Sequence, residues 1–312
     1  MSDLRAPPKR ADDGASRAAA PAIRAPRPPP AAGLIAFDGF FWLLFSLVVA
    51  GAALPTAWLW RVAPLSAPWS IALSIPLFGV FLVLLLLEIA ILRRIAPRLR
   101  PGRYRFPGSS MARAWLWTLQ LQRIAFHSWW ATLIMGSASL RYLALRALGA
   151  KVAFRCMMSS DVSHVDPGML DVAEGTLMGS KVLTGGHLIT GDSLLLGTVR
   201  IEPGAEIHVD GRVGPGTRLG AGAQLGIHSI APFENDIGER AKIGMHCTLA
   251  AHAHIGPGAR IGDGCVIGRD ARVGAGAIVA PGSTVPQGAV VADGARFPSD
   301  RVVAQATRSE GG

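Results

Sequence analysis

Residues 261–294 read IGDGCVIGRDARVGAGAIVAPGSTVPQGAVVADG, and an aliphatic residue recurs in this stretch at every sixth position. The same period runs back to Leu177 and gives twenty positions, of which nineteen are Leu, Ile or Val and one is Ala231. Neither an α-helix nor an alternating β-strand has a period of six residues. A repeat of this regularity predicts a solenoid, in which stacked coils bury one shared core.

Each hexad is expected to form one side of a triangular coil, with its aliphatic residue inside and Gly or another small residue at the corner. Three hexads complete a coil of eighteen residues, and equivalent residues then stack roughly 4.8 Å apart. Twenty hexads predict six to seven coils in a β-helix domain at 159–296, followed by a flexible tail at 297–312. The stretch SIAPFENDIG at 229–238 keeps the period without the regular Gly, so it forms either a coil or an outward loop.

The N-terminal half has a different composition. Residues 1–33 are rich in Ala, Pro and charged side chains and hold almost nothing large and apolar, which predicts a disordered basic tail. Two windows without a formal charge follow, at Gly39–Trp60 and Val62–Leu87. Because roughly 20 apolar residues cross a bilayer core, both windows are long enough to span it. We therefore expect a transmembrane helical hairpin at 34–92.

Charge is divided unevenly along the chain. Residues 1–158 hold 19 Lys and Arg against 5 Asp and Glu, whereas residues 159–312 hold 12 against 16. The basic excess flanks the apolar windows, which favours the lipid bilayer as a partner and argues against nucleic acid. Six arginines lie between Arg93 and Arg105, directly after the second window. The positive-inside tendency therefore predicts a multi-pass protein of the cytoplasmic (inner) membrane whose solenoid faces the cytoplasm.

The segment 93–158 is interpreted as a basic linker that carries an amphipathic, interfacial helix. Trp and Arg side chains are spread through residues 111–148, a combination that suits the edge of a membrane. The uncharged window Ile124–Leu140 leaves a third membrane span as the alternative. A third span would place the solenoid on the outer side of the membrane.

The hexad pattern resembles that of the hexapeptide-repeat acyltransferases, which form left-handed parallel β-helices. This resemblance implies a mainly β protein and an enzyme that moves an acyl group, with acetyl as the leading candidate. The donor would be acetyl-CoA or another acyl thioester, and the acceptor a hydroxyl or amine of a membrane-associated molecule. By the same resemblance the protein is expected to be a homotrimer, with a histidine as general base between neighbouring subunits.

His187 is the expected catalytic base. It lies in LTGGHLITGD at 183–192, which resembles the segment carrying the catalytic histidine in sugar O-acetyltransferases of the galactoside, maltose and colanic-acid types. Thr184, Gly185, Gly186 and His187 match that segment, whereas Leu188 stands where those enzymes often have Asp. Three carboxylates remain as candidates to orient the imidazole: Asp192, Asp166 and Asp171.

The C-terminal coils are expected to bind the acyl donor. In this family the corresponding end of the solenoid holds acetyl-CoA, and Gly-rich turns there suit a pantetheine arm, while basic side chains suit its phosphates. The residues implied by the resemblance are Gly262, Arg260, Arg269, Arg272 and Gly274.

A second resemblance concerns the layout of the whole chain. The order of hairpin, basic linker, RYLALRALGAKV at 141–152 and His-bearing coil resembles the membrane region that ends the ε-poly-lysine synthetases. That region resembles an acyl- or aminoacyl-transfer module, which implies an aminoacyl thioester on a separate carrier protein as an alternative donor. The product of such a module would be a peptide bond.

Two further alternatives use other features of the sequence. His228 and His246 are eighteen residues apart, with His252 and His254 close by, and γ-class carbonic anhydrases bind a metal with histidines stacked across coils of a similar solenoid. Their spacing departs from that pattern, and Cys156, Cys247 and Cys265 lack metal-type spacing, so no metal and no disulfide framework are expected. The other alternative is a membrane-tethered scaffold without catalytic activity.

Overall fold

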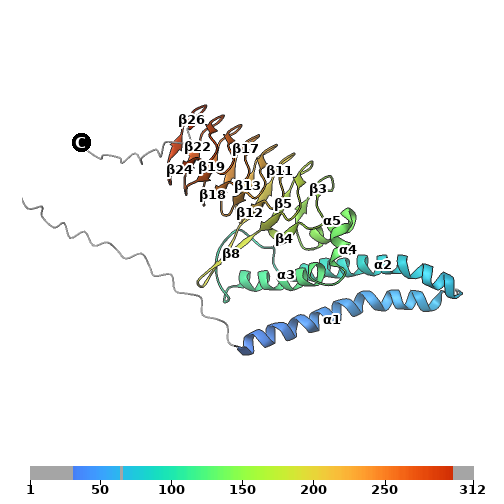
Figure 1. Ribbon diagram of the computed structural model, residues 1–312. Coiled ribbons are helices and arrows are strands. Elements are labelled where there is room, and N and C mark those ends of the chain that lie inside the picture. Colours follow the sequence, from blue (N-terminus) through green and yellow to red (C-terminus); the bar gives the residue numbers. More distant parts are fainter. Residues whose placement is uncertain (1–30, 64–65, 298–312) are drawn as a thin grey trace, which may run out of the picture.

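The computed structural model describes residues 31–63 and 66–297. The predicted tails at 1–33 and 297–312 therefore lie outside the described residues, except for residues 31–33, which begin a helix, and Phe297, which ends a strand. Two long helices open the chain, α1 (Ala31–Val62) and α2 (Ala67–Arg93), and they run side by side in opposite directions (Figure 1). Their common core contains Phe41, Leu44, Val48 and Ala52 of α1 and Phe81, Leu82, Leu85, Leu86 and Ile89 of α2. The two uncharged windows therefore form one helical hairpin.

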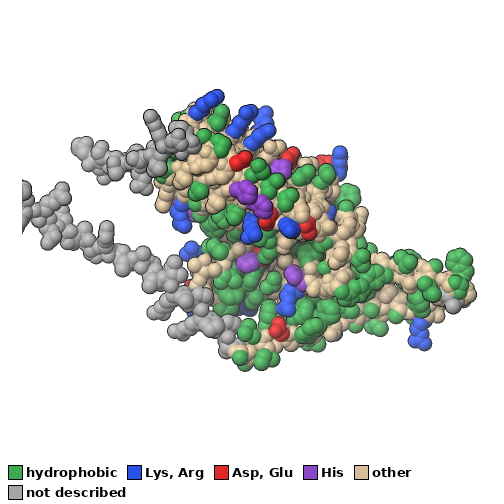
Figure 2. Space-filling model, in the orientation of Figure 1, with side chains coloured by type: hydrophobic (Ala, Val, Ile, Leu, Met, Phe, Trp, Pro, Cys, Tyr) green, Lys and Arg blue, Asp and Glu red, His purple; other side chains and the backbone are tan. Residues whose placement is uncertain are grey.

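Hydrophobic side chains cover much of the visible surface of this hairpin (Figure 2). Both helices are long and apolar enough to cross a membrane, and only 17% and 28% of their most apolar windows are buried. The exposed side chains include Trp42, Leu43, Leu47, Trp58, Ile71 and Ile75. An exposed apolar surface of this extent favours contact with lipid or with another protein.

The segment after the hairpin forms three helices instead of the single interfacial helix expected. These are α3 (Ser110–Phe126), α4 (Ala131–Gly136) and α5 (Ala138–Ala147). The hydroxyls of Ser109 and Ser137 cap α3 and α5 by accepting hydrogen bonds from the amides of Ala112 and Leu140. The uncharged window 124–140 is divided among these helices, so it contains no continuous helix long enough for the alternative third span.

Residues 151–297 form a parallel β-solenoid of three sheets (Figure 1). The first sheet contains β2 (Lys151–Val152), β5 (Leu170–Val172), β10 (Val199–Ile201), β13 (Arg218–Leu219), β16 (Asp236–Ile237), β19 (His254–Ile255), β22 (Arg272–Val273) and β25 (Val290–Val291). The second contains β3 (Met157–Met158), β6 (Leu177–Met178), β11 (Glu206–Ile207), β14 (Gln224–Leu225), β17 (Lys242–Ile243), β20 (Arg260–Ile261), β23 (Ile278–Val279) and β26 (Arg296–Phe297). The third contains β4 (Ser163–Val165), β7 (Leu183–Gly185), β12 (Arg212–Val213), β15 (Ile230–Ala231), β18 (Thr248–Leu249), β21 (Val266–Ile267) and β24 (Thr284–Val285).

The solenoid has about eight coils, which is more than the six to seven predicted. Its strands begin at Lys151, ahead of the predicted boundary at 159, because a lead-in without the hexad pattern also coils. From Ile201 onward the aliphatic residues that mark the period point inward and are buried, among them Leu219, Ile237 and Ile255. The prediction of a mainly β fold built as a parallel solenoid is confirmed.

The repeat was assigned incorrectly before Ile201. Met178 and Thr184 are the buried residues of the earlier coil, and they stack on Ile207 and Val213 of the next coil. Leu177 and Leu183, which the period marked as inward, each stand one residue too early. The expected series and the true one therefore differ by one position in this part of the chain.

An insertion explains this difference. Val172 and Ile201 are neighbours in adjacent coils although 29 residues separate them, whereas 18 residues separate Ile201 from Leu219. The eleven extra residues contain Ile189 and Leu195, which lie in a hairpin of β8 (His187–Thr190) and β9 (Ser193–Leu196) outside the coils. Two hexads contain twelve residues, so an insertion of eleven residues shifts the period by only one position. Aliphatic residues that stand one position before the true inward residues therefore continue the six-residue series through the insertion.

The inserted hairpin belongs to a separate antiparallel sheet. The strand β1 (Gly102–Arg105), from the basic linker, pairs along the whole of β9, which gives the order β1-β9-β8. Leu194 and Leu196 of β9 are buried in a cluster with Trp115 of α3 and Met169 of the short 3-10 helix Pro167–Met169. This sheet thus connects the basic linker, α3 and the first coils of the solenoid.

The stretch 229–238 continues the solenoid as a regular coil and does not form an outward loop. Ala231 stacks on Val213, and Ile237 stacks on Leu219, in the ordinary eighteen-residue register. The buried side chain of Asn235 replaces an apolar contact with hydrogen bonds, because its amide nitrogen donates to the carbonyl oxygen of Ala250 at 2.6 Å. A satisfied polar group of this kind can lie inside a coil at little cost.

Candidate functional site

His187 and Asp166 meet where the inserted hairpin leaves the solenoid. Asp166 follows β4 in a left-handed backbone conformation, with φ of +63°, and its side chain is 3% exposed. His187 is the first residue of β8, and its Nδ1 lies 2.5 Å from Oδ2 of Asp166. Gly186 allows this approach, because a Cβ there would lie 2.5 Å from Cβ of Met169 and 3.1 Å from Cβ of Asp166.

The carboxylate of Asp166 is held by three donors. Oδ1 accepts a 2.6 Å hydrogen bond from Nε1 of Trp115, and Oδ2 accepts one of 3.2 Å from the amide of Gly186 together with the bond from His187. A carboxylate accepts from Nδ1 only if that nitrogen carries the proton, so Nε2 is the acceptor nitrogen of the neutral His187 ring. The side chain of His187 is 24% exposed, and Nε2 has no protein partner among the described residues.

Helix α3 holds the loop that carries Asp166. Gln122 accepts a hydrogen bond from the amide of Asp166 at 3.3 Å and donates one to the carbonyl oxygen of His164 at 3.0 Å. The ring of Trp115 lies 4.7 Å from the ring of His187, centroid to centroid, at an interplanar angle of 58°. Trp115 and Gln122 were not predicted as site residues, since they are far from His187 in the sequence and share no motif with it.

His164 is a second buried histidine near this site, with a structural role. Its side chain points into the solenoid, where Nδ1 lies 2.9 Å from Oγ1 of Thr184. Burial, with a smaller contribution from the charge of Arg141, lowers the pKa of His164 to about 4. His164 is therefore neutral near pH 7 and inaccessible to a substrate.

Of the three carboxylates expected to orient His187, the structure places only Asp166 beside it. Asp192 is exposed at the turn between β8 and β9, and its carbonyl oxygen accepts a hydrogen bond from the amide of Phe106. Asp171 lies in β5 between Lys151 and Arg200 of neighbouring strands, in a different sheet from the residues before His187. The expected pairing of His187 with Asp192 is therefore not formed.

The residues expected to bind the acyl donor do not converge. Arg260 lies on the second sheet, Arg272 on the first, and Arg269 is exposed at a corner between coils. The amides of Gly262 and Gly274 donate to the carbonyl oxygens of Val279 and Val291 in the next coil, so they are not available to a pantetheine arm. Arg272 lies four strands along the first sheet from Arg200, which is beside the inserted hairpin. At about 4.8 Å per strand, this separation is roughly 19 Å.

Histidine side chains are visible at several places on this face of the molecule (Figure 2). His228 and His246 stack at 5.0 Å with an interplanar angle of 15°, and Nδ1 of His228 lies 2.9 Å from Asp210. His252 contacts Glu234 at 3.1 Å, and His254 contacts Asp236 at 3.0 Å. Within residues 31–63 and 66–297 no group of three or more His, Cys, Asp or Glu side chains is arranged to hold a metal ion.

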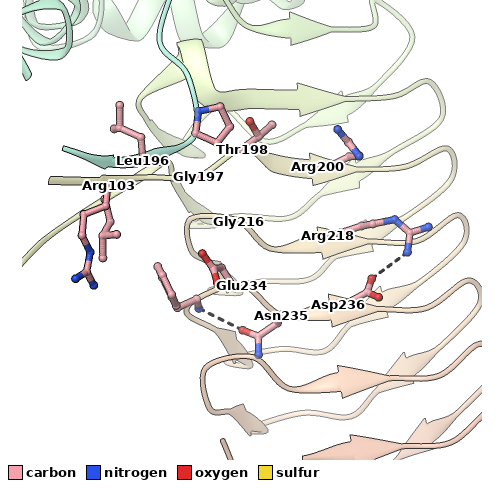
Figure 3. A pocket seen from close by; sticks show the side chains of 14 residues that line it. Arg103, Leu196, Gly197, Thr198, Arg200, Gly216, Arg218, Glu234, Asn235 and Asp236 are labelled. Carbon is pink, nitrogen blue, oxygen red and sulfur yellow. Dashed lines mark hydrogen bonds and ion pairs between the residues drawn. The ribbon is translucent and has the colours of Figure 1, made fainter. Parts of the chain in front are cut away.

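A cavity of about 700 Å³ lies between the inserted sheet and the outer surface of the solenoid (Figure 3). One wall comes from Arg103 of β1 and residues 195–198, and the opposite wall from Arg200, Arg218 and residues 233–236. The hydrogen bonds that Arg218 donates to Glu202 and, to a smaller extent, to Asp236 raise the pKa of its guanidinium above the usual value. The cavity is therefore lined by both charged and apolar side chains, from parts of the chain that are distant in sequence.

A comparison with protein families identifies the repeat in part of the solenoid. The family described as bacterial transferase hexapeptide (six repeats) matches residues 236–269. A search among curated protein sequences finds no match. The first solved structure found, the acetyltransferase domain of PglB from Neisseria gonorrhoeae, is 29% identical and matches 32% of this chain and 51% of its own, with a TM-score of 0.26.

Two other solved structures are more distant in sequence. The UDP-N-acetylglucosamine O-acyltransferase LpxA from Moraxella catarrhalis is 14% identical, with 44% of this chain and 67% of its own chain matched and a TM-score of 0.25. PerB from Caulobacter crescentus, in complex with CoA and GDP-perosamine, is 18% identical, with 53% and 59% matched and a TM-score of 0.23. This chain thus spans about half to two thirds of these structures. Residues 236–269 match the hexapeptide repeat of the bacterial transferases, and they lie within the parallel β-solenoid.

Proposed function

We propose that this protein is a membrane-anchored acyltransferase that uses His187 as its general base. The pairing of His187 with a buried, fully hydrogen-bonded carboxylate is the observation that carries the proposal. The pair stands at the base of a hairpin inserted into an otherwise regular solenoid, where the ring is partly exposed. A histidine oriented in this way can take a proton from a hydroxyl or amine near neutral pH.

The proposed reaction moves an acyl group, acetyl in the simplest case, from a thioester to an acceptor. Nε2 of His187 takes the proton of the acceptor hydroxyl or amine as that atom attacks the thioester carbonyl carbon. A new ester or amide bond forms, the carbon–sulfur bond breaks, and the departing thiolate receives the proton from His187. Acetyl-CoA is the simplest donor, and an acyl or aminoacyl thioester on a carrier protein is the alternative.

Asp166 and Trp115 act through His187 in this proposal. The carboxylate fixes the Nδ1–H tautomer of His187 and favours the imidazolium that forms when Nε2 takes the proton. The indole N–H of Trp115 in turn fixes the orientation of the carboxylate. Such support keeps the base within hydrogen-bond reach of the acceptor without rearrangement.

The apolar hairpin and the basic linker supply the proposed location. Exposed apolar residues on α1 and α2 suit the bilayer interior, and the arginines after α2 suit the cytoplasmic surface of the inner membrane. Acyl thioesters are cytoplasmic, so a solenoid on that side has access to them. An acceptor attached to the same membrane would reach His187 by lateral diffusion. As in the resembling enzymes, we expect a homotrimer.

Transfer of labelled acetyl from acetyl-CoA to a membrane extract tests the proposal, with the full chain purified in mild detergent. His187→Ala should lower the rate at least about 100-fold, the smaller end of general-base contributions. His228→Ala is the matched control, because His228 pairs with Asp210 in the same way on the exposed solenoid edge. Full activity of the His187 variant contradicts the mechanism. Absence of transfer, together with no thermal stabilisation by acyl-CoA, favours the scaffold.

A further inference from the structure

We propose that the cavity between the inserted sheet and the solenoid binds the phosphate groups of a nucleotide-sized ligand, through Arg103 and Arg200. The cavity, at about 700 Å³, has the volume of a small-molecule site. The inference that this ligand is a substrate rests on the proposed transfer activity, since both coenzyme A thioesters and lipid-linked acceptors carry phosphate. The inference that the cavity binds phosphate rests only on the charges that line it.

The balance of charge in the cavity is positive. Three arginines and two carboxylates line it. Both carboxylates are already paired: Glu234 contacts His252, and Asp236 contacts His254 and also accepts a 2.9 Å hydrogen bond from Arg218. Each of the two lining carboxylates therefore already has a partner among the described residues.

Two of the arginines have no such partner. Arg218 is fully engaged, with Glu202 at 2.7 and 3.0 Å and Asp236 at 2.9 Å. Arg103 and Arg200 form no ion pair and no side-chain hydrogen bond within the part of the chain that the structure describes. Guanidinium groups that line one cavity and have no carboxylate partner are suited to bind the oxygen atoms of phosphate.

The geometry places these two cations on opposite walls. Arg200 lies beside Arg218 on successive coils, whereas Arg103 enters from β1, which the inserted hairpin holds against the solenoid (Figure 3). A ligand with more than one phosphate oxygen along its length can contact both walls. The half-buried ring of Phe233 adds an apolar surface beside them.

Neither His187 nor Asp166 lines the cavity. Side chains alternate between the two faces of a strand, and Leu194 and Leu196 of β9 are buried toward Trp115 and Met169. Leu195 belongs to the other face and lines the cavity together with Leu196, which pairs with His187 across the hairpin. The ring of His187 contacts Trp115, so it lies on the α3 side of the sheet. Binding in the cavity and proton transfer at His187 can thus be measured independently.

Titration calorimetry on the full chain in dodecyl maltoside tests the site with three probes: pyrophosphate, coenzyme A and dihexanoyl phosphatidylglycerol. Arg103→Gln and Arg200→Gln should each weaken binding of the accepted probe about tenfold or more, the loss expected for a charged hydrogen bond. Arg296→Gln is the control, because Arg296 is exposed on another sheet. An unchanged melting temperature shows that each variant folds.

The probes identify the source of the phosphate. Weakened binding of coenzyme A assigns the cavity to the donor, and weakened binding of the phosphatidylglycerol assigns it to a lipid-linked ligand. His187→Ala should lower transfer at least about 100-fold and leave binding unchanged, so failure of the transfer proposal is distinguishable from failure of this one. The inference is overturned if no probe binds the wild type, or if Arg296→Gln weakens binding as much as the other two substitutions.

Discussion

The indole nitrogen of Trp115 donates a 2.6 Å hydrogen bond to Oδ1 of Asp166, across 51 residues of sequence. Both side chains are buried, and the other carboxylate oxygen of Asp166, Oδ2, accepts a hydrogen bond from Nδ1 of His187. Helix α3, which follows the apolar hairpin and the basic linker, therefore contributes directly to the candidate site. The position of the base depends on how the helical part of the chain docks against the solenoid.

Trp115→Phe tests this dependence. The phenyl ring keeps most of the packing and removes the hydrogen bond, which leaves Oδ1 of Asp166 buried without its donor. We expect transfer activity to fall about tenfold or more, and the free energy of unfolding to fall by about 1–3 kcal/mol. Steady-state kinetics and thermal unfolding measure the two effects.

Trp117→Phe is the matched control. Its indole donates a 2.9 Å hydrogen bond to the carbonyl oxygen of Leu92, away from Asp166, so a similar loss of stability with normal activity is expected. Equal activities of the two variants would show that Trp115 does not position the base.

Gly186→Ala tests the close approach of the chain to Asp166. A Cβ at this position would lie 2.5 Å from Cβ of Met169, so either the loop or the start of β8 must move. Such overpacking typically costs about 1–3 kcal/mol, and here it should also displace His187 and lower transfer activity. Thermal unfolding and kcat/KM are the measurements.

Gly185→Ala provides an internal comparison. It is the preceding residue, and a Cβ there meets no atom within 4 Å. Its activity and stability should stay close to those of the wild type. If Gly186→Ala behaves in the same way, the contact between Gly186 and the Asp166 loop is looser than the structure indicates.

The solenoid could be predicted from the sequence because its determinants are local and repeated. Every coil from Ile201 onward uses the same inward position, so the period alone fixes the stacking of Ile237 on Leu219 and Ile255 on Ile237. The inserted hairpin could not be recognised, because its length nearly preserves the period and its aliphatic residues continue the series. The structure was needed to show that Ile189 lies outside the coils.

The candidate site was only partly predictable for a different reason. His187 lies in a recognisable segment, but the choice among Asp166, Asp171 and Asp192 depends on how distant segments pack. Asp192 is the nearest of these in sequence, and β8 carries it away from His187 to the far end of the hairpin. Trp115 is identified only by the docking of α3.

Acid should destabilise the first coils through His164. Burial lowers its pKa to about 4, below its ordinary value of 6.5, so the unfolded chain binds this proton more tightly than the folded one. The contribution of neutral His164 to the free energy of unfolding is complete above pH 6.5 and is lost as the pH falls toward 4. The total loss is about 3 kcal/mol. Urea unfolding at a series of pH values measures this loss.

His164→Leu should remove that part of the pH dependence, whatever its effect on stability at pH 7. His208→Leu, which changes a partly exposed histidine of the solenoid, should leave the dependence as it is in the wild type. An unaltered slope in the His164 variant between pH 6.5 and 4 would assign the acid sensitivity to other groups.

The sidedness of the solenoid decides whether it can reach a cytoplasmic thioester, and two single cysteines test it. Val290 is 72% exposed on β25, and Ser66 is exposed between α1 and α2. In a Cys156→Ala background the remaining thiols, Cys247 and Cys265, lie in the solenoid core, where burial raises their pKa and keeps them unreactive. An impermeant maleimide applied to intact spheroplasts should label Ser66→Cys. It should label Val290→Cys only after the membrane is permeabilised. The opposite pattern would place the solenoid outside, where the proposed donor is absent, and a hairpin that does not cross the membrane would protect both positions.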